Sequence, residues 1–95
     1  PFVLSIIRFS DAGRIEEHYR PDEIERAAEG DGSALVRTYL PADEWAVSFL
    51  FGLGIPFEVL EPEALRRLVA QRAMLILDSN AKRPEFRNMD FPEVQ

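Results

Sequence analysis

The sequence predicts one α+β domain, because segments with the composition of strands alternate along the chain with segments that have helical spacing. The chain has 95 residues, 46% of them hydrophobic, and includes one Trp, two Tyr and seven Phe. That content is typical of a globular protein with a single hydrophobic core. No internal repeat divides the sequence, so we expect one folding unit.

The first predicted strand is Phe2–Phe9 (FVLSIIRF), a β-branched and aromatic run that Pro1 and Ser10-Asp11 enclose. One face of this strand carries Phe2, Leu4 and Ile6, and the other carries Val3, Ile7 and Phe9. A strand that is apolar on both faces is typical of the interior of a sheet. We therefore place it centrally.

A short amphipathic helix is predicted after this strand. Ser10 is the expected N-cap, because Ala12, Ile15 and Tyr19 follow it at helical spacing. Pro21 ends the helix, since proline lacks the N–H that a helix interior needs.

Asp22–Glu29 (DEIERAAE) admits two interpretations. Its acids, alanines and following Gly30 favour a helix by local propensity. It can also be an edge strand that pairs with Ser33–Leu40 (SALVRTYL) through a Gly30-Asp31-Gly32 turn. Because Ser33–Leu40 is rich in residues that favour strands, we choose the hairpin.

Two helices and a strand complete the predicted domain. Pro41–Leu53 forms a helix that is apolar almost all round, with Trp45 and Phe49 four residues apart on one side. Ile55–Leu60 returns as a strand. A last amphipathic helix begins at Pro62 and carries Leu65, Leu68, Val69, Leu75 and Ile76. We expect the domain to cover residues 1–78, and residues 79–95 to form a tail with isolated apolar positions at Phe86, Met89 and Phe91.

The predicted order is β-α-β-β-α-β followed by a helix and a tail, which is the ferredoxin-like split βαβ arrangement. Right-handed crossovers place its two main helices on one face of a four-stranded antiparallel sheet. The first strand is apolar on both faces, so something must also cover the second face. The last helix, the tail and a second copy of the chain are the three candidates.

Candidate catalytic and metal-binding residues are scarce. The chain has no cysteine, and its single histidine, His18, rules out a two-histidine metal site within one chain. None of its serines lies in a G-x-S-x-G turn, and Gly52-Leu53-Gly54 follows a helix where a phosphate loop would follow a strand. We therefore expect no enzyme activity, no metal site and no cofactor.

The charge distribution argues against direct DNA binding. The net charge is −6, and residues 11–31 carry eight acids against three arginines. Such a surface repels the phosphate backbone of duplex DNA. No apolar run approaches the about 18 residues of a membrane span.

Four arginines are candidates for contact with an anionic ligand or a neighbouring domain. Arg8 and Arg37 interrupt apolar strands, and Arg66 and Arg67 open the last helix. A planar guanidinium suits both kinds of contact. The alternative is that these side chains only mark the solvent-exposed face.

Trp45–Gln71 (WAVSFLFGLGIPFEVLEPEALRRLVAQ) resembles the C-terminal extension, or WCX domain, of bacterial WYL-domain transcription regulators. In that family an apolar helix ends in glycine, a strand of the type V-E-V-L-x-P follows, and x-x-L-R comes next. The corresponding positions here are Gly52 or Gly54, Phe57–Pro62 and Glu63–Arg66. Two features depart from the pattern: Leu77-Asp78 stands where an aromatic often follows the last helix, and the tail is unmatched.

The resemblance implies a ferredoxin-like fold and supports a strand at Asp22–Glu29. It also implies a cytoplasmic regulator in which helix-turn-helix and WYL domains precede this piece of a longer chain. The extension would dimerise, contact the upstream WYL domain and relay the sensing of an effector, for which the resemblance suggests nucleic-acid fragments. The expected interface residues are Phe2, Leu4, Ile6, Trp45 and Phe49. The alternative is a free-standing ferredoxin-like module that binds a small ligand or a protein.

Overall fold

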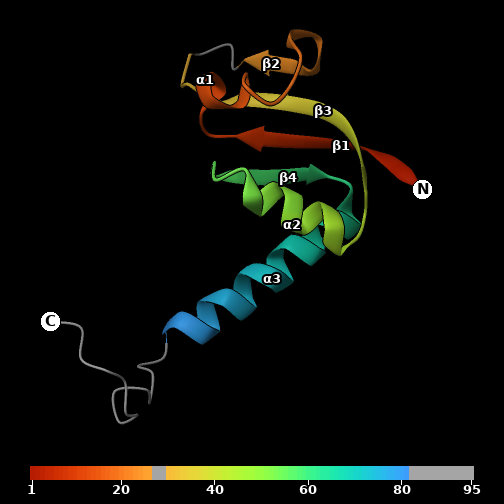
Figure 1. Ribbon diagram of the computed structural model, residues 1–95, viewed down its shortest axis with the longest axis vertical. Helices are drawn as coiled ribbons and strands as arrows, with labels where there is room; N and C mark the ends of the chain where they lie inside the picture. The colour runs from red at the N-terminus through yellow and green to blue at the C-terminus, as the bar shows by residue number, and fades with distance from the viewer. Residues whose placement is uncertain (27–29, 82–95) are drawn as a thin grey trace, which may run out of the picture.

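The fold is known from a computed structural model, which describes residues 1–26 and 30–81 of the chain. Figure 1 shows a four-stranded antiparallel sheet with helices packed against it, so the expectation of an α+β domain is confirmed. The strands are β1 (Phe2–Phe9), β2 (Ile24–Arg26), β3 (Ala34–Pro41) and β4 (Phe57–Glu61). The helices are α1 (Ala12–Ile15), the 3₁₀ turn η1 (Pro21–Glu23), α2 (Glu44–Gly52) and α3 (Glu63–Ala81).

Strand β1 occupies the interior of the sheet, as its two apolar faces predict. The strand order is β2-β3-β1-β4, and every neighbouring pair is antiparallel. Along β3 the pairing runs without interruption from Phe2↔Pro41 to Phe9↔Ala34. The β1–β4 pairing shifts register between Ile6 and Ile7.

Helix α1 is shorter than predicted, and its N-cap is a different residue. Asp11, not Ser10, caps it: the Asp11 carboxylate accepts the N–H of Arg14 at 3.1 Å. The helix ends at Ile15, so Tyr19 lies outside it. Arg20 is extended (φ −73°, ψ 153°), because the residue before a proline is disfavoured in the helical region.

The contested segment contains a strand, as chosen, but a short one. Ile24–Arg26 pairs with β3, from Ile24↔Val36 to Arg26↔Ala34, whereas the preceding residues Pro21–Glu23 form the 3₁₀ turn. Residues 27–29 lie outside the described part of the chain. Gly30 and Gly32 both have positive φ (67° and 87°), which glycine tolerates best and which the turn into β3 requires.

One face of the sheet forms the hydrophobic core. Along β1 the odd-numbered residues Ser5, Ile7 and Phe9 are fully buried, whereas the even-numbered residues face the other way. Helix α2 covers this inner face, and its N-terminus is capped by the Asp43 carboxylate, which accepts the N–H groups of Trp45 and Ala46. The buried hydrophobic residues are Ile7, Phe9, Ala12, Ile15, Ala34, Val36, Leu40, Ala46, Val47, Leu50, Ile55, Val59 and Leu65.

Helix α3 is anchored to this core only by its first half. Leu65 is fully buried, and Leu68 and Val69 pack against the core from its border. Arg72 then pairs with Glu44 of α2. Beyond Arg72 the helix continues to Ala81 and runs away from the sheet (Figure 1). Residues 82–95, which include Phe86, Met89 and Phe91, lie outside the described part of the chain.

Candidate interaction surface

The face of the sheet opposite α2, which we call the outer face, is open in the described part of the chain. It carries the even-numbered residues of β1 and, by the β1–β3 register, the odd-numbered residues of β3. The outer-face residues of these two strands are Phe2, Leu4, Ile6, Arg8, Leu35, Arg37, Tyr39 and Pro41. Their order along the strands divides the face into an apolar end and a charged end.

The apolar end of the sheet consists of Phe2, Leu4 and Tyr39. Leu4 and Tyr39 are directly opposite each other in the register, and Phe2 follows along β1. The exposed fractions are 67% for Phe2, 48% for Leu4 and 64% for Tyr39, whereas Ile6 is half-buried. A last helix that covered this face would bury these side chains, so α3 is not the cover.

All four predicted arginines form ion pairs within the chain, three of them at the charged end. Arg8 lies 3.3 Å from an Asp31 oxygen, and Arg37 lies 2.7 Å from a Glu25 oxygen. The Arg66 guanidinium donates to the Val59 carbonyl oxygen at 3.1 Å and lies 3.6 Å from the Glu58 carboxylate. Glu58 is also the register partner of Arg8 on β4, so Arg66 lies near the charged end although it belongs to α3.

Arg67 does not join this group. It pairs with Glu63 one turn back along α3, with 3.4 Å between its Nε and the carboxylate oxygen. Because exposed pairs of this kind are worth little, Arg67 stabilises the helix only slightly. The sequence placed the four arginines in one class, and the structure separates Arg67 from the rest.

A polar hollow of about 360 Å³ lies at the charged end. Its lining residues are Arg8, Ser10, Asp31, Ser33, Pro56, Phe57 and Glu58. The hydroxyl and the N–H of Ser33 donate to Asp31 at 2.6 and 2.8 Å, and these bonds hold the pKa of the Asp31 carboxyl below its usual value. Arg8 is paired with Asp31 here, and Arg66 lies beside Glu58, so the guanidinium groups are already paired and the hollow does not favour a phosphate-like ligand.

Trp45 and Phe49 form a separate aromatic surface on α2. Their rings are stacked, with centroids 5.4 Å apart and planes within 4° of each other. Trp45 is 59% exposed, whereas Phe49 packs against the edge of the core. Since α2 covers the inner face, this pair lies on the opposite layer from Phe2 and Leu4. The five expected interface residues therefore lie on two different surfaces.

The second half of α3 is a surface that the sequence analysis missed. Leu75 and Ile76 were assigned to the buried side of an amphipathic helix, but they are 67% and 46% exposed, and their neighbours Met74 and Leu77 are 70% and 67% exposed. The assignment was wrong because the helix leaves the core before reaching them. Four consecutive apolar residues occupy every side of a helix, and this pattern was the available signal.

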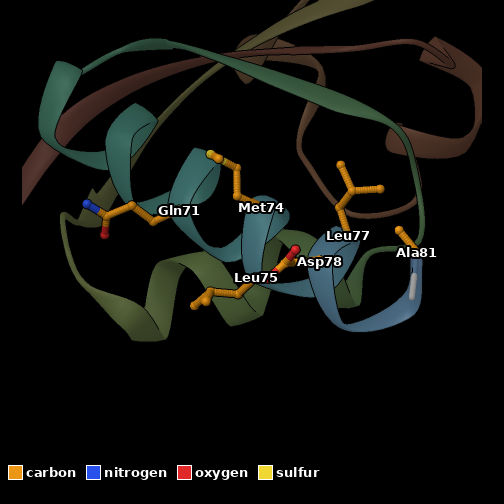
Figure 2. A pocket seen from close by; sticks show the side chains of 6 residues that line it. All are labelled: Gln71, Met74, Leu75, Leu77, Asp78 and Ala81. Atoms are coloured by element: carbon orange, nitrogen blue, oxygen red, sulfur yellow. The ribbon is translucent and has the colours of Figure 1, made fainter. Parts of the chain in front are cut away.

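Figure 2 shows the side chains around a groove on this second half of α3, which we call its free half. The groove has a volume of about 760 Å³ and is lined by Gln71, Met74, Leu75, Leu77, Asp78 and Ala81. Within the part of the chain that the structure describes, the lining residues all come from α3 and follow the three- and four-residue spacing of one helical side.

Within residues 1–26 and 30–81, no group of three or more His, Asp or Glu side chains could hold a metal ion. None of the helices described there is long and apolar enough to cross a membrane.

Comparison with known proteins gives one match. The family model of the WCX domain matches residues 6–77, which is more than half of the chain and runs from β1 into the free half of α3. No curated protein and no solved structure matches the sequence. The matched range includes the glycine–strand–proline–Leu-Arg block that carried the resemblance. The chain belongs to the WCX domain family.

Proposed function

We propose that this chain is the regulatory and dimerisation domain of a WYL-type transcription regulator, and that it relays effector sensing to DNA binding by upstream domains. The WCX match over residues 6–77 is the observation that carries the proposal. The net charge of −6 also supports it, because DNA contact then has to come from other domains of the protein.

We further infer that the domain is ferredoxin-like. The strand order β2-β3-β1-β4, antiparallel throughout, is what two interlocked split β-α-β units produce, and it supports this topology. In this chain the first crossover is reduced: α1 has four residues, and η1 completes the connection to β2. The second crossover, through α2, is a full helix.

The domain acts by binding, without chemistry of its own. The arginines of its charged end form ion pairs with Asp31, Glu25 and Glu58. Their first role is therefore to hold the residues of this surface together. The apolar end of the sheet is the proposed contact with a second copy, because monomeric proteins rarely leave large apolar patches open. The Trp45–Phe49 surface on the other layer remains available for the upstream WYL domain.

The test uses the full-length regulator from which the chain derives. We expect its gene to encode helix-turn-helix and WYL domains upstream of β1. In that protein, Leu4→Glu should place a charge in the dimer contact and weaken operator binding about tenfold or more, because a dimer binds two half-sites and a monomer binds one. His18→Glu adds a charge at an exposed position outside the strands and is the matched control.

Operator binding is measured by fluorescence anisotropy, and the oligomeric state by sedimentation of the same samples. A Leu4→Glu protein that is monomeric yet binds operator as tightly as the parent would contradict the regulatory role. An open reading frame with no DNA-binding domain beside this one would contradict it more directly.

A further inference from the structure

Two apolar surfaces of this chain are open at the same time. One is the apolar end of the sheet (Phe2, Leu4 and Tyr39), and the other is the free half of α3 (Met74–Leu77). We propose that in a dimer the free half of α3 from each copy packs on the apolar end of the partner's sheet. This inference rests on the proposed dimerisation and specifies which surfaces meet.

Helix α3 cannot reach the outer face of its own sheet. Its first turn is held in the core by Leu65, next to edge strand β4, and Arg72 ties it to α2 on the inner side through Glu44 and through the Ser48 hydroxyl. From there the helix runs away from the sheet, as Figure 1 shows. Contact with its own Leu4 would require the anchored first half to leave the core.

The distribution of apolar side chains on α3 requires cover from more than one side. Successive residues of a helix lie about 100° apart, so Met74 to Leu77 surround the axis. A helix that is apolar all round is typically buried all round. A second copy offers two suitable surfaces at once: the apolar end of its sheet on one side, and its own α3, near the two-fold axis, on the other.

The exposed area agrees with a dimer contact. Seven side chains of the two surfaces are 46–70% exposed: Phe2, Leu4, Tyr39, Met74, Leu75, Ile76 and Leu77. At roughly 200 Å² for a large apolar side chain, they expose about 800 Å² per chain. A standard-size specific interface takes about that amount from each partner.

Reciprocal packing of each α3 on the partner's sheet, which we call the exchange, also gives a closed dimer. A helix-on-sheet contact joins two different surfaces, so a one-sided version leaves one surface free at each end and propagates into a filament. In a two-fold dimer the contact occurs twice, and both surfaces of both copies are covered. The occupant of each surface is thus a second copy of this chain.

The chain contains no cysteine, which permits a direct test by cross-linking. Two single variants, Leu4→Cys and Leu77→Cys, are prepared, and each is labelled with a different affinity tag. A short bifunctional thiol reagent is added to each variant alone and to their equimolar mixture. We expect the strongest cross-linked dimer in the mixture, and we expect it to carry both tags.

Other patterns overturn the proposal in distinguishable ways. Strong cross-linking of Leu4→Cys alone, without the mixed product, indicates a sheet-to-sheet dimer: it refutes the exchange but leaves the proposed dimerisation standing. Cross-linking of Leu77→Cys with itself, without the mixed product, indicates helix-to-helix contact without the sheet, and it also refutes the exchange while leaving dimerisation standing. A chain that sediments as a monomer at all concentrations refutes both the exchange and the dimerisation.

Charge substitutions give an independent test of the proposed contact. Leu77→Glu and Leu4→Glu should each raise the dimer dissociation constant at least about tenfold while leaving the circular dichroism spectrum unchanged, because both residues are open in the single chain. Ser79→Glu adds the same charge to the same half of α3 at a polar position and should dimerise like the parent. Equal weakening by Ser79→Glu, or no weakening by Leu77→Glu, contradicts the proposed contact.

Discussion

The two halves of α3 should differ strongly in how much stability they lose on the same substitution. Leu65 and Leu77 belong to one helix, but Leu65 is fully buried and Leu77 is 67% exposed. Leu65→Ala removes side-chain atoms from a packed core and leaves a cavity. Leu77→Ala removes the same atoms from a side chain that water already reaches, so in the single chain it leaves no cavity.

The expected magnitudes follow from this difference. For Leu65→Ala we expect the free energy of unfolding to fall by about 3 kcal/mol, within the usual range for a buried leucine. In a domain of this size that corresponds to a fall in Tm of about 15 °C. For Leu77→Ala we expect a change within about 0.5 kcal/mol, as for surface substitutions in general.

Urea denaturation, followed by far-ultraviolet circular dichroism and by the fluorescence of the single Trp45, measures both values. The chain concentration is kept low enough for the monomer to predominate. The experiment is then repeated at high concentration, where dimer formation stabilises the folded state by mass action. If α3 packs on the partner's sheet in a dimer, Leu77→Ala lowers the free energy of unfolding by more as the chain concentration rises. The loss caused by Leu65→Ala in the core stays nearly constant.

The reasoning is refuted if Leu65→Ala lowers the free energy of unfolding by less than about 1 kcal/mol, because Leu65 then does not anchor α3 in the core. It is also refuted if Leu77→Ala costs the monomer more than about 2 kcal/mol, because the second half of α3 would then be packed within its own chain.

Three further outcomes are expected. Asp43→Ala removes the acceptor for the Trp45 and Ala46 N–H groups at the start of α2 and should lower the free energy of unfolding by about 1 kcal/mol in urea titrations; no change would show that the cap is dispensable. Burial and the charge of Glu23 raise the pKa of Tyr19 from 10.0 to about 12, so the stability from its neutral phenol is present below pH 10 and lost as pH rises through about 12. An absorbance titration at 295 nm should show this late step in the parent, and its persistence in Tyr19→Phe would refute the assignment. The chain alone should not bind random duplex DNA at physiological salt, and a Kd below about 10⁻⁴ M in an anisotropy titration would contradict the inference from charge.

The sequence by itself determined the order of the elements and the place of β1. Apolar residues in both phases of Phe2–Phe9 are typical of a strand in the interior of a sheet, and the pairing with β3 on one side and β4 on the other confirms that position. The block from Gly52 through Arg66 was also sufficient for the family, because its spacing belongs to consecutive residues and needs no tertiary information.

Local patterns could not determine features that depend on distant partners. Asp22–Glu29 has helical propensity, but its residues 24–26 form a strand because β3 supplies their hydrogen bonds from ten residues away in sequence. Likewise, the two apolar faces of β1 look equivalent in sequence. Only the side on which α2 packs decided that Ile7 and Phe9 are buried while Phe2 and Leu4 remain open.

The free half of α3 shows the same limit most clearly. Helical spacing tells which residues share a side of the helix, but it says nothing about what lies beside that side. Leu65 in the core and Arg72 against Glu44 fix the direction in which α3 leaves edge strand β4. That direction carries Met74 to Leu77 away from the domain. Burial is a property of the neighbours that a helix meets, and only the tertiary structure places those neighbours.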